Sequence, residues 1–198
     1  MVIDGAYAGV RLYIELPHIE QLAFCAHGPL NARNDPAMEK YLPVLARQDP
    51  EKEFDPYLSA FSMSNPATID LLATWIEKIA EITGGYNNRI NIFLSEGRTY
   101  CHDDMRKSME EKGFYDHYVT EFEAVMEAMR RVREKYPWLK YDIVLSQGCR
   151  PPDTRERIFK MVPEDVGVIY YDGNLTYTSG KDEIIFPLLE EFAQNGKR

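Results

Sequence analysis

Short apolar runs alternate with longer amphipathic segments over most of the chain. From residue 58 onward, four short runs are largely apolar: Leu58–Ser62, Ile90–Leu94, Ile143–Leu145 and Val168–Tyr171. Nearly continuous apolar runs of this length are typical of strands buried on both faces, as in parallel sheets. We therefore expect four parallel strands that neighbour one another in this order. A further candidate strand lies near Val10–Leu16.

The amphipathic segments between these runs carry recognisable helix ends. Asn65 and Pro66 supply an N-cap residue and a proline at the first helical position, and Gly84 with Gly85 ends the segment. A second helix is predicted from about Asp116 to Tyr136, where glutamates come early and arginines late, as the helix dipole favours. Two further helices are predicted at Thr154–Met161 and Lys181–Gln194.

Strands that alternate with helices at these spacings indicate right-handed βαβ crossovers and an α/β fold. No low-complexity stretch or charged block divides the sequence. We therefore expect a single α/β domain over residues 1–198, with a less regular lead-in over 1–55 and repeated βα units over 56–198.

Chain length limits the kind of α/β fold. A (β/α)8 barrel typically needs about 250 residues, and four or five strands do not complete one. The prediction is therefore a parallel-stranded (β/α) barrel that is partial or incomplete, with a smaller open α/β domain as the alternative. A helix reaching Gln194 with no closing strand after it favours the incomplete barrel. An unfinished sheet would expose edges that favour self-association.

A polar residue and a glycine follow three of the four predicted strands. Glu96, Gln147 and Asp172 each precede a glycine at such a strand end. Because the carboxyl ends of parallel strands face the active site in α/β proteins, we expect these three side chains round one mouth. A polar residue followed by glycine is also ordinary turn chemistry, but three in register are harder to attribute to turns alone.

Two carboxylates and an amide at one mouth are the groups that glycosidic bond cleavage requires. One carboxyl group protonates the leaving oxygen, and the other acts as nucleophile or activates water. Glu96 is the candidate general acid and Asp172 the candidate nucleophile or base. The sequence does not give their separation, so retaining and inverting mechanisms both stay open.

Side chains beside these strand ends could bind a polyhydroxylated ligand. Arginine, tyrosine and amide groups suit sugar hydroxyls, and an arginine could bind a ligand carboxylate through two hydrogen bonds. The same arginines could instead pair with surface acids. The candidate substrate-binding residues are Gln147, Arg98, Tyr100, Arg150 and Tyr171.

Composition and charge narrow the classes of partner. The 23 basic and 32 acidic residues give a formal net charge of -9, which repels phosphate backbones, so nucleic acid is not expected as a partner. No uncharged apolar run reaches the length of about 18 residues that a membrane span needs, and the N-terminus lacks the pattern of a signal peptide. We expect a soluble, unprocessed chain with no membrane partner, cytoplasmic by default unless a longer parent protein is exported.

Motifs for cofactors and metals are weak. Neither common glycine-rich phosphate-binding motif occurs, so no nucleotide cofactor is expected. The run Cys101-His102-Asp103-Asp104 looks like a metal cluster, but no second Cys/His pair lies at a zinc-like spacing, and no metal site is predicted. Asp103 or Asp104 is expected to cap the short helix that follows. Isolated histidines such as His117 are expected to have structural roles.

Several short motifs together resemble a known family. The run Ser62-Met63-Ser64-Asn65-Pro66 leads into a helix, a strand ends at Ser95-Glu96 with Cys101 soon after, and a long helix closes on Lys135-Tyr136-Pro137. Over about residues 55–198 the chain resembles the catalytic domains of α-glucuronidase-like (β/α)8-barrel glycoside hydrolases and their largely uncharacterised relatives from polysaccharide-degrading bacteria. The resemblance implies a barrel domain that acts on an oligosaccharide or glycoside through acidic residues at strand ends. Relatives often carry a cysteine cluster after the acidic strand end, where this chain has Cys101 alone.

Two hypotheses for the function follow. The first is a carbohydrate-active barrel domain, a glycoside hydrolase that uses Glu96 and Asp172 as paired carboxylates. The alternative is a non-catalytic α/β domain that binds a sugar or a protein, or an inactive fragment of a larger glycosidase. In that case the same polar residues serve as hydrogen-bonding groups.

Overall fold

A four-stranded parallel sheet organises the described part of the chain. The computed structural model describes residues 14–16, 45–47, 59–84, 89–95, 101–145 and 151–170, together with positions 193, 194 and 196. The strands of this sheet, in spatial order, are β1 (Ile14–Leu16), β4 (Arg89–Phe93), β5 (Lys140–Leu145) and β6 (Gly167–Tyr170). The chain therefore has the α/β architecture that its sequence predicts.

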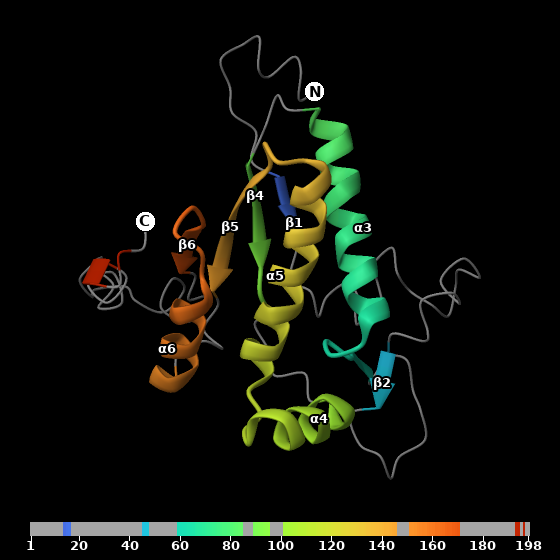
Figure 1. The fold of residues 1–198 in the computed structure, drawn as a ribbon, viewed down its shortest axis with the longest axis vertical. Helices are drawn as coiled ribbons and strands as arrows, with labels where there is room; N and C mark the ends of the chain where they lie inside the picture. Colours follow the sequence, from blue (N-terminus) through green and yellow to red (C-terminus); the bar gives the residue numbers. More distant parts are fainter. Residues whose placement is uncertain are drawn as a thin grey trace, which may run out of the picture.

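Three helices cover this sheet. They are α3 (Pro66–Thr83), α5 (His117–Lys135) and α6 (Pro152–Met161). Helix α5 packs between α3 and α6, and the three lie side by side on one face of the sheet (Figure 1). A fourth helix, α4 (His102–Lys112), lies beyond the end of the sheet toward which the strands point (Figure 1).

A separate two-stranded sheet corrects one predicted strand. β2 (Leu45–Arg47) and β3 (Ser59–Phe61) pair antiparallel with each other. The prediction that Leu58–Ser62 begins the parallel sheet is therefore wrong, and β1 occupies the place beside β4. A short apolar run indicates burial without identifying its partner strand, so the pattern could not separate these two arrangements.

The remaining strand predictions are confirmed. β4, β5 and β6 are parallel neighbours in the predicted order, and β1 confirms the candidate strand near Val10–Leu16. Two short strands, β1 and β2, thus come from the lead-in over residues 1–55, which looked less regular in the sequence.

Predicted helix ends are also confirmed. Asn65 Oδ1 accepts a hydrogen bond from Ala67 N at 3.0 Å, and Gly84 ends α3 with a φ of 55°, in the left-handed region that favours glycine. Asp116 caps the start of α5, and Tyr136 caps its end. The predicted helix Thr154–Met161 is α6, which begins two residues earlier. The predicted helix Lys181–Gln194 lies outside the described residues except for its last two positions.

The hydrophobic core lies between the sheet and the helix layer. Side chains alternate between the two faces of a strand, and every second residue of β4 and β5 belongs to this core. The fully buried members include Ile90, Ile92 and Ile143 from the strands, Leu72 and Ile76 from α3, and Phe122, Val125 and Met129 from α5. Removing this apolar surface from water is the main stabilising contribution to the fold.

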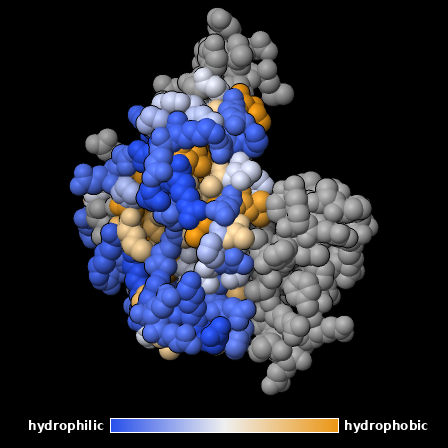
Figure 2. All heavy atoms as spheres, turned by 45° about the vertical axis from the view of Figure 1, so that its right-hand side comes forward, coloured by the Kyte–Doolittle hydropathy of each residue, from blue (hydrophilic) through white to orange (hydrophobic). Residues whose placement is uncertain are grey.

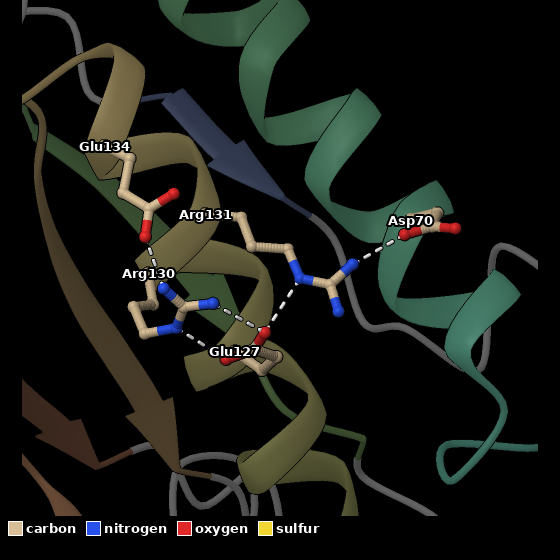
Figure 3. Close-up of polar contacts among 5 residues, drawn as sticks. All are labelled: Asp70, Glu127, Arg130, Arg131 and Glu134. Carbon is tan, nitrogen blue, oxygen red and sulfur yellow. Dashed lines mark hydrogen bonds and ion pairs between the residues drawn. The ribbon is translucent and has the colours of Figure 1, made fainter.

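A charged network covers the outer side of α5 and links it to α3. Glu127 accepts hydrogen bonds from Arg130 at 2.8 and 2.9 Å and from Arg131 at 2.8 Å. Arg131 also bonds Asp70 of α3 at 2.6 Å, and Arg130 bonds Glu134 (Figure 3). The hydrogen bonds from Arg130 and Arg131 lower the pKa of Glu127 to about 2.

Hydrophilic residues dominate the described surface on the face shown in Figure 2, with small hydrophobic areas among them. Three large apolar side chains in the described part are exposed: Ile82, Met109 and Ile169. Among the helices described, none combines the length and the apolar character that crossing a bilayer requires.

Candidate functional site

The carboxyl edge of the parallel sheet is the candidate site. β4, β5 and β6 run in one direction and end at the same edge, where α4 and the start of α5 lie (Figure 1). In open α/β sheets, ligands bind in the crevice outside the carboxyl ends of the strands. The catalytic and substrate-binding residues predicted from the sequence follow these same strands along the chain.

All seven of those candidate residues lie outside the described part of the chain. They are Glu96, Arg98, Tyr100, Gln147, Arg150, Tyr171 and Asp172. The structure therefore locates them only by the strands that precede them, which are β4, β5 and β6. Their predicted convergence in one cleft stays a prediction.

Strand register nevertheless relates three of the candidates. Phe93 of β4 pairs with Val144 of β5, and Val144 pairs with Ile169 of β6. Counting three positions onward along each strand leads to Glu96, Gln147 and Asp172. The three candidates therefore follow paired strand positions at the same spacing in the sequence, and their placement on one row stays a prediction.

A fully buried carboxylate lies beside the end of β4. Glu121 of α5 has no exposed surface, and its Oε1 accepts a hydrogen bond from Ser95 N at 2.8 Å. Its Oε2 lies 3.3 Å from Nε2 of His117, which is one helical turn earlier and is also buried. An unpaired buried carboxylate would be strongly destabilising, so these contacts are needed to hold Glu121 in place. They fix Ser95, the residue directly before Glu96.

A second buried carboxylate joins α4 to the segment between β3 and α3. Asp104 accepts hydrogen bonds from Ser62 Oγ and Met63 N, both at 2.7 Å. It also accepts hydrogen bonds from Ser64 N at 3.2 Å and from Ser64 Oγ at 2.7 Å. Four donors therefore converge on one carboxylate, which fastens the start of α4 to residues just before α3.

The predicted capping role of Asp103 or Asp104 is wrong. The N-cap of α4 is Cys101, no side chain caps this helix, and both aspartates already lie in its first turn. A carboxylate in the first turn suits the helix dipole whether or not it caps, so the sequence could not distinguish the two positions. Within the described residues, no three or more His, Cys, Asp and Glu side chains are grouped so as to hold a metal ion.

Cys101 is a buried thiol with a raised pKa. Its side chain is fully buried, and burial together with the negative charge of Asp104 raises its pKa to about 12. Since the thiolate is the nucleophile, this residue is not a candidate for covalent catalysis.

Asp116 holds the starts of α5 and α6 together at the same edge. Its Oδ1 accepts hydrogen bonds from Tyr118 N at 3.1 Å and from Val119 N at 3.3 Å. Its Oδ2 accepts a hydrogen bond from Thr154 Oγ1 of α6 at 2.5 Å and lies 3.8 Å from Arg157 Nη1. One side chain thus caps one helix and binds the next.

The buried polar groups Ser95, Glu121 and Asp104 at this edge are held by contacts within the protein. Ser95, His117 and Glu121 are residue types that can form a hydrolytic triad, but Ser95 and Glu121 are fully buried and the serine hydroxyl is out of reach of a substrate. The carboxylate of Asp104 is occupied by four donors.

Sequence reasoning missed both buried carboxylates. Glu121 was counted among the early glutamates that suit the dipole of its helix, yet it lies three residues after Tyr118 and four before Val125. Both of those residues belong to the apolar stripe of α5, so a charged residue on that stripe was an available signal of a buried charge. Asp104 carried no comparable signal, because its donors are about forty positions away in the sequence.

A groove is lined by residues of α5, Tyr141 of β5 and the end of α6. Its volume is about 640 Å³, and Tyr141 OH donates a hydrogen bond to Met126 Sδ at 3.4 Å within it. Burial raises the pKa of Tyr141 to about 12. The apolar lining consists of Phe122, Met126, Tyr141, Met161 and Pro163.

Comparisons with known proteins return no match among protein-family models, curated proteins or solved structures.

Proposed function

We propose that this chain is a carbohydrate-active (β/α) domain, similar to the α-glucuronidase-like glycoside hydrolases, and that it binds its sugar at the carboxyl edge of the parallel sheet. The observation that carries the proposal is the register of β4, β5 and β6. Continued three residues past the paired positions Phe93, Val144 and Ile169, this register would bring two carboxylates and an amide onto one row.

The winding of the sheet supports a barrel-type domain. β4, β5 and β6 are adjacent in chain order, and α5 and α6, which connect them, pack on the same face of the sheet. In (β/α) barrels each unit adds the next strand on the same side, whereas doubly wound sheets carry helices on both faces. We therefore propose an incomplete barrel in preference to a doubly wound domain.

The proposed row of Glu96, Gln147 and Asp172 suggests a chemical role for each residue. Glu96 is the proposed general acid, Asp172 the proposed nucleophile or base, and Gln147, which follows β5 in the sequence, is proposed to bind substrate hydroxyls. The remaining proposed substrate-binding residues are Arg98, Tyr100, Arg150 and Tyr171. An arginine among them would suit the carboxylate of a uronic acid, because it can form two parallel hydrogen bonds to it.

The test uses the full chain with two classes of glycoside, one with a poor alkyl leaving group and one with an activated aryl leaving group. Glu96→Gln should lower turnover of the alkyl glycoside by about 10²–10⁴-fold and spare much of the aryl turnover, because a good leaving group needs little protonation. Asp172→Asn should impair both substrates about equally. Glu164→Gln is the matched control, since Glu164 is exposed in the loop between α6 and β6.

Results of a different pattern would favour the alternative. Sugar binding without hydrolysis, lost in the Glu96 and Asp172 variants, would indicate a non-catalytic binding domain or an inactive fragment. Equal, mild losses from both substitutions on both substrates would show that the two residues only shape a pocket. Absence of both hydrolysis and sugar binding would overturn the proposed function.

A further inference from the structure

The groove formed by α5, β5 and the end of α6 has the size of a small-molecule site. Its volume of about 640 Å³ lies within the range of about 300–1,000 Å³ that is typical of ligand pockets. We propose that this groove binds an uncharged aromatic molecule that carries a carbonyl oxygen. The inference does not rest on the proposed sugar site, because every residue that carries it belongs to the described part of the chain.

The apolar part of the lining favours an aromatic ligand. Met126 of α5 and Met161, the last residue of α6, are only partly buried, and Phe122 and Pro163 also line the groove. Methionine side chains adapt to the shape of a ligand, and their sulfur atoms make favourable contacts with aromatic rings. Covering partly exposed apolar side chains also removes them from water, which is favourable. A ring system therefore suits this lining better than a polar chain.

The charged part of the lining disfavours a charged ligand. Five charged residues line the groove, and each of them is already paired with an opposite charge. These ion pairs join Arg130 to Glu127 and Glu134, Arg133 to Asp165, and Glu123 to Lys112. A ligand carboxylate or ammonium would gain little here, because it would exchange one partly exposed ion pair for another.

Tyr141 supplies the contact that selects an oxygen atom. Its side chain is buried, and its hydroxyl donates to Met126 Sδ at 3.4 Å. A thioether is a weak acceptor, whereas a buried tyrosine hydroxyl usually finds a good partner. Since Tyr141 and Met126 both line the groove, the carbonyl oxygen of a bound ligand can replace the sulfur as acceptor. Arg133 lies over the Tyr141 ring, 5.9 Å from its centroid, and helps to hold the ring in place.

NMR of the methionine methyl groups tests the proposal on the full chain, with 2-acetylnaphthalene as the probe. The methyl resonances of Met126 and Met161 should shift saturably, with a dissociation constant below about 1 mM. Met126→Leu and Met161→Leu variants assign these two resonances. Met109, which is exposed on α4, and Met63, which is buried in the core, should not shift.

Related probes define the ligand class. 2-Ethylnaphthalene keeps the two rings but has no oxygen, so its affinity should not depend on the Tyr141 hydroxyl. 2-Naphthoate and 2-naphthylmethylammonium carry opposite charges, and both should bind more weakly than 2-acetylnaphthalene. Tighter binding of either charged probe would overturn the assignment to an uncharged ligand.

Tyr141→Phe removes the hydroxyl and keeps the ring. It should weaken the binding of 2-acetylnaphthalene about two- to tenfold, the range expected for one hydrogen bond, and leave that of 2-ethylnaphthalene unchanged. Met161→Gln introduces a polar group at a partly exposed position of the lining and should weaken the binding of both probes. Glu164→Gln is the matched control, since Glu164 is exposed three residues after Met161, and it should change neither affinity.

Three results would overturn the proposal. The first is the absence of saturable shifts at Met126 and Met161, or shifts of equal size at Met109, which would indicate adsorption to the surface. The second is a Tyr141→Phe variant that binds both uncharged probes as the wild-type chain does, since the hydroxyl would then select nothing. The third is a shift of Met126 and Met161 with protein concentration alone, which would show that a second copy of the chain occupies the groove.

Discussion

Asp142 of β5 and Gly167 of β6 are paired directly across the sheet, and a Cβ at position 167 would lie 2.0 Å from Asp142 Oδ1. Asp142 also forms an ion pair with Arg89 of β4. These residues alternate with the core positions of their strands, so the pair lies on the face of the sheet away from the helices. Because glycine has no Cβ, the Asp142 carboxylate can occupy the space beside position 167.

Gly167→Ala should therefore destabilise the fold by about 1–3 kcal/mol, the range expected for overpacking a closely packed position. Urea unfolding of the single variant measures this loss. In an Asp142→Ala background the same glycine substitution should have a much smaller effect, because the clashing oxygen is gone. An equal loss in both backgrounds would mean that the clash is not the cause.

Asp116→Ala should be more destabilising than the loss of an ordinary helix cap. It removes the N-cap of α5, worth about 1 kcal/mol, and also the acceptor for the buried hydroxyl of Thr154. We expect a total of about 2 kcal/mol from these two contributions in urea unfolding. Asn65→Ala, which removes the exposed side-chain cap of α3, is the comparison. Thr154→Val should reproduce only the part of the loss that links α5 to α6.

The charged network on α5 should stabilise the protein only above acidic pH. Arg130 and Arg131 lower the pKa of Glu127 from 4.5 to about 2. A lowered folded-state pKa gives stability that is fully present above the unfolded pKa and is lost as the pH falls through the folded pKa. Glu127→Gln should thus flatten the dependence of stability on pH between about pH 4.5 and 2, with a loss at neutral pH of at most about 1 kcal/mol because the group is partly exposed.

Two controls check that interpretation. High salt should reduce the effect of Glu127→Gln, since screening weakens partly exposed ion pairs. Glu164→Gln, at an exposed position, should leave the acid limb of the stability curve unchanged. An unaltered slope in Glu127→Gln would show that the network does not contribute.

Cys101 should resist alkylation in the folded protein. With its pKa raised to about 12 from an ordinary value of 9.0, its thiolate fraction at pH 8 is about a thousandfold lower than that of a free cysteine. Burial restricts access further. Peptide mapping after iodoacetamide treatment should find Cys101 unmodified in buffer and fully modified in denaturant. Rapid labelling of the native protein would contradict the burial of this thiol.

The elements that the sequence predicted well are those in which local signals agree. Asn65 and Gly84 mark the two ends of α3, and Asp116 marks the start of α5, because capping depends on residues close in the sequence. The strand at Ile90–Leu94 was predicted for a similar reason, since its burial is encoded in a continuous apolar run.

The features that could not be predicted depend on contacts distant in the sequence. β3 and β1 are both short, and only the folded chain decides which of them lies beside β4. The donors that surround Asp104 come from about forty positions away, so its role as an acceptor has no local signature. The predicted row through Glu96 and Asp172 also depends on the register, because spacing along the chain does not determine how strands align.

The same register makes a prediction about reaction stereochemistry. Neighbouring strands lie about 4.8 Å apart, so equivalent positions on β4 and β6, on either side of β5, are about 9.6 Å apart. If the register of β4 and β6 continues to Glu96 and Asp172, their side chains should leave the sheet on the same side and keep a similar separation. Retaining glycosidases hold their carboxyl groups about 5–5.5 Å apart, whereas inverting enzymes hold them about 6.5–9.5 Å apart, with room for a water molecule.

We therefore expect hydrolysis with inversion, in which Asp172 activates water and does not form a covalent intermediate. Proton NMR of the first product, recorded before mutarotation, should show the anomer opposite to that of the substrate. Glu164→Gln should give the same anomer as the wild-type chain. Retention would require two carboxyl groups about half as far apart. The catalytic pair would then lie on neighbouring strands, and the row through Glu96, Gln147 and Asp172 would not be the catalytic one.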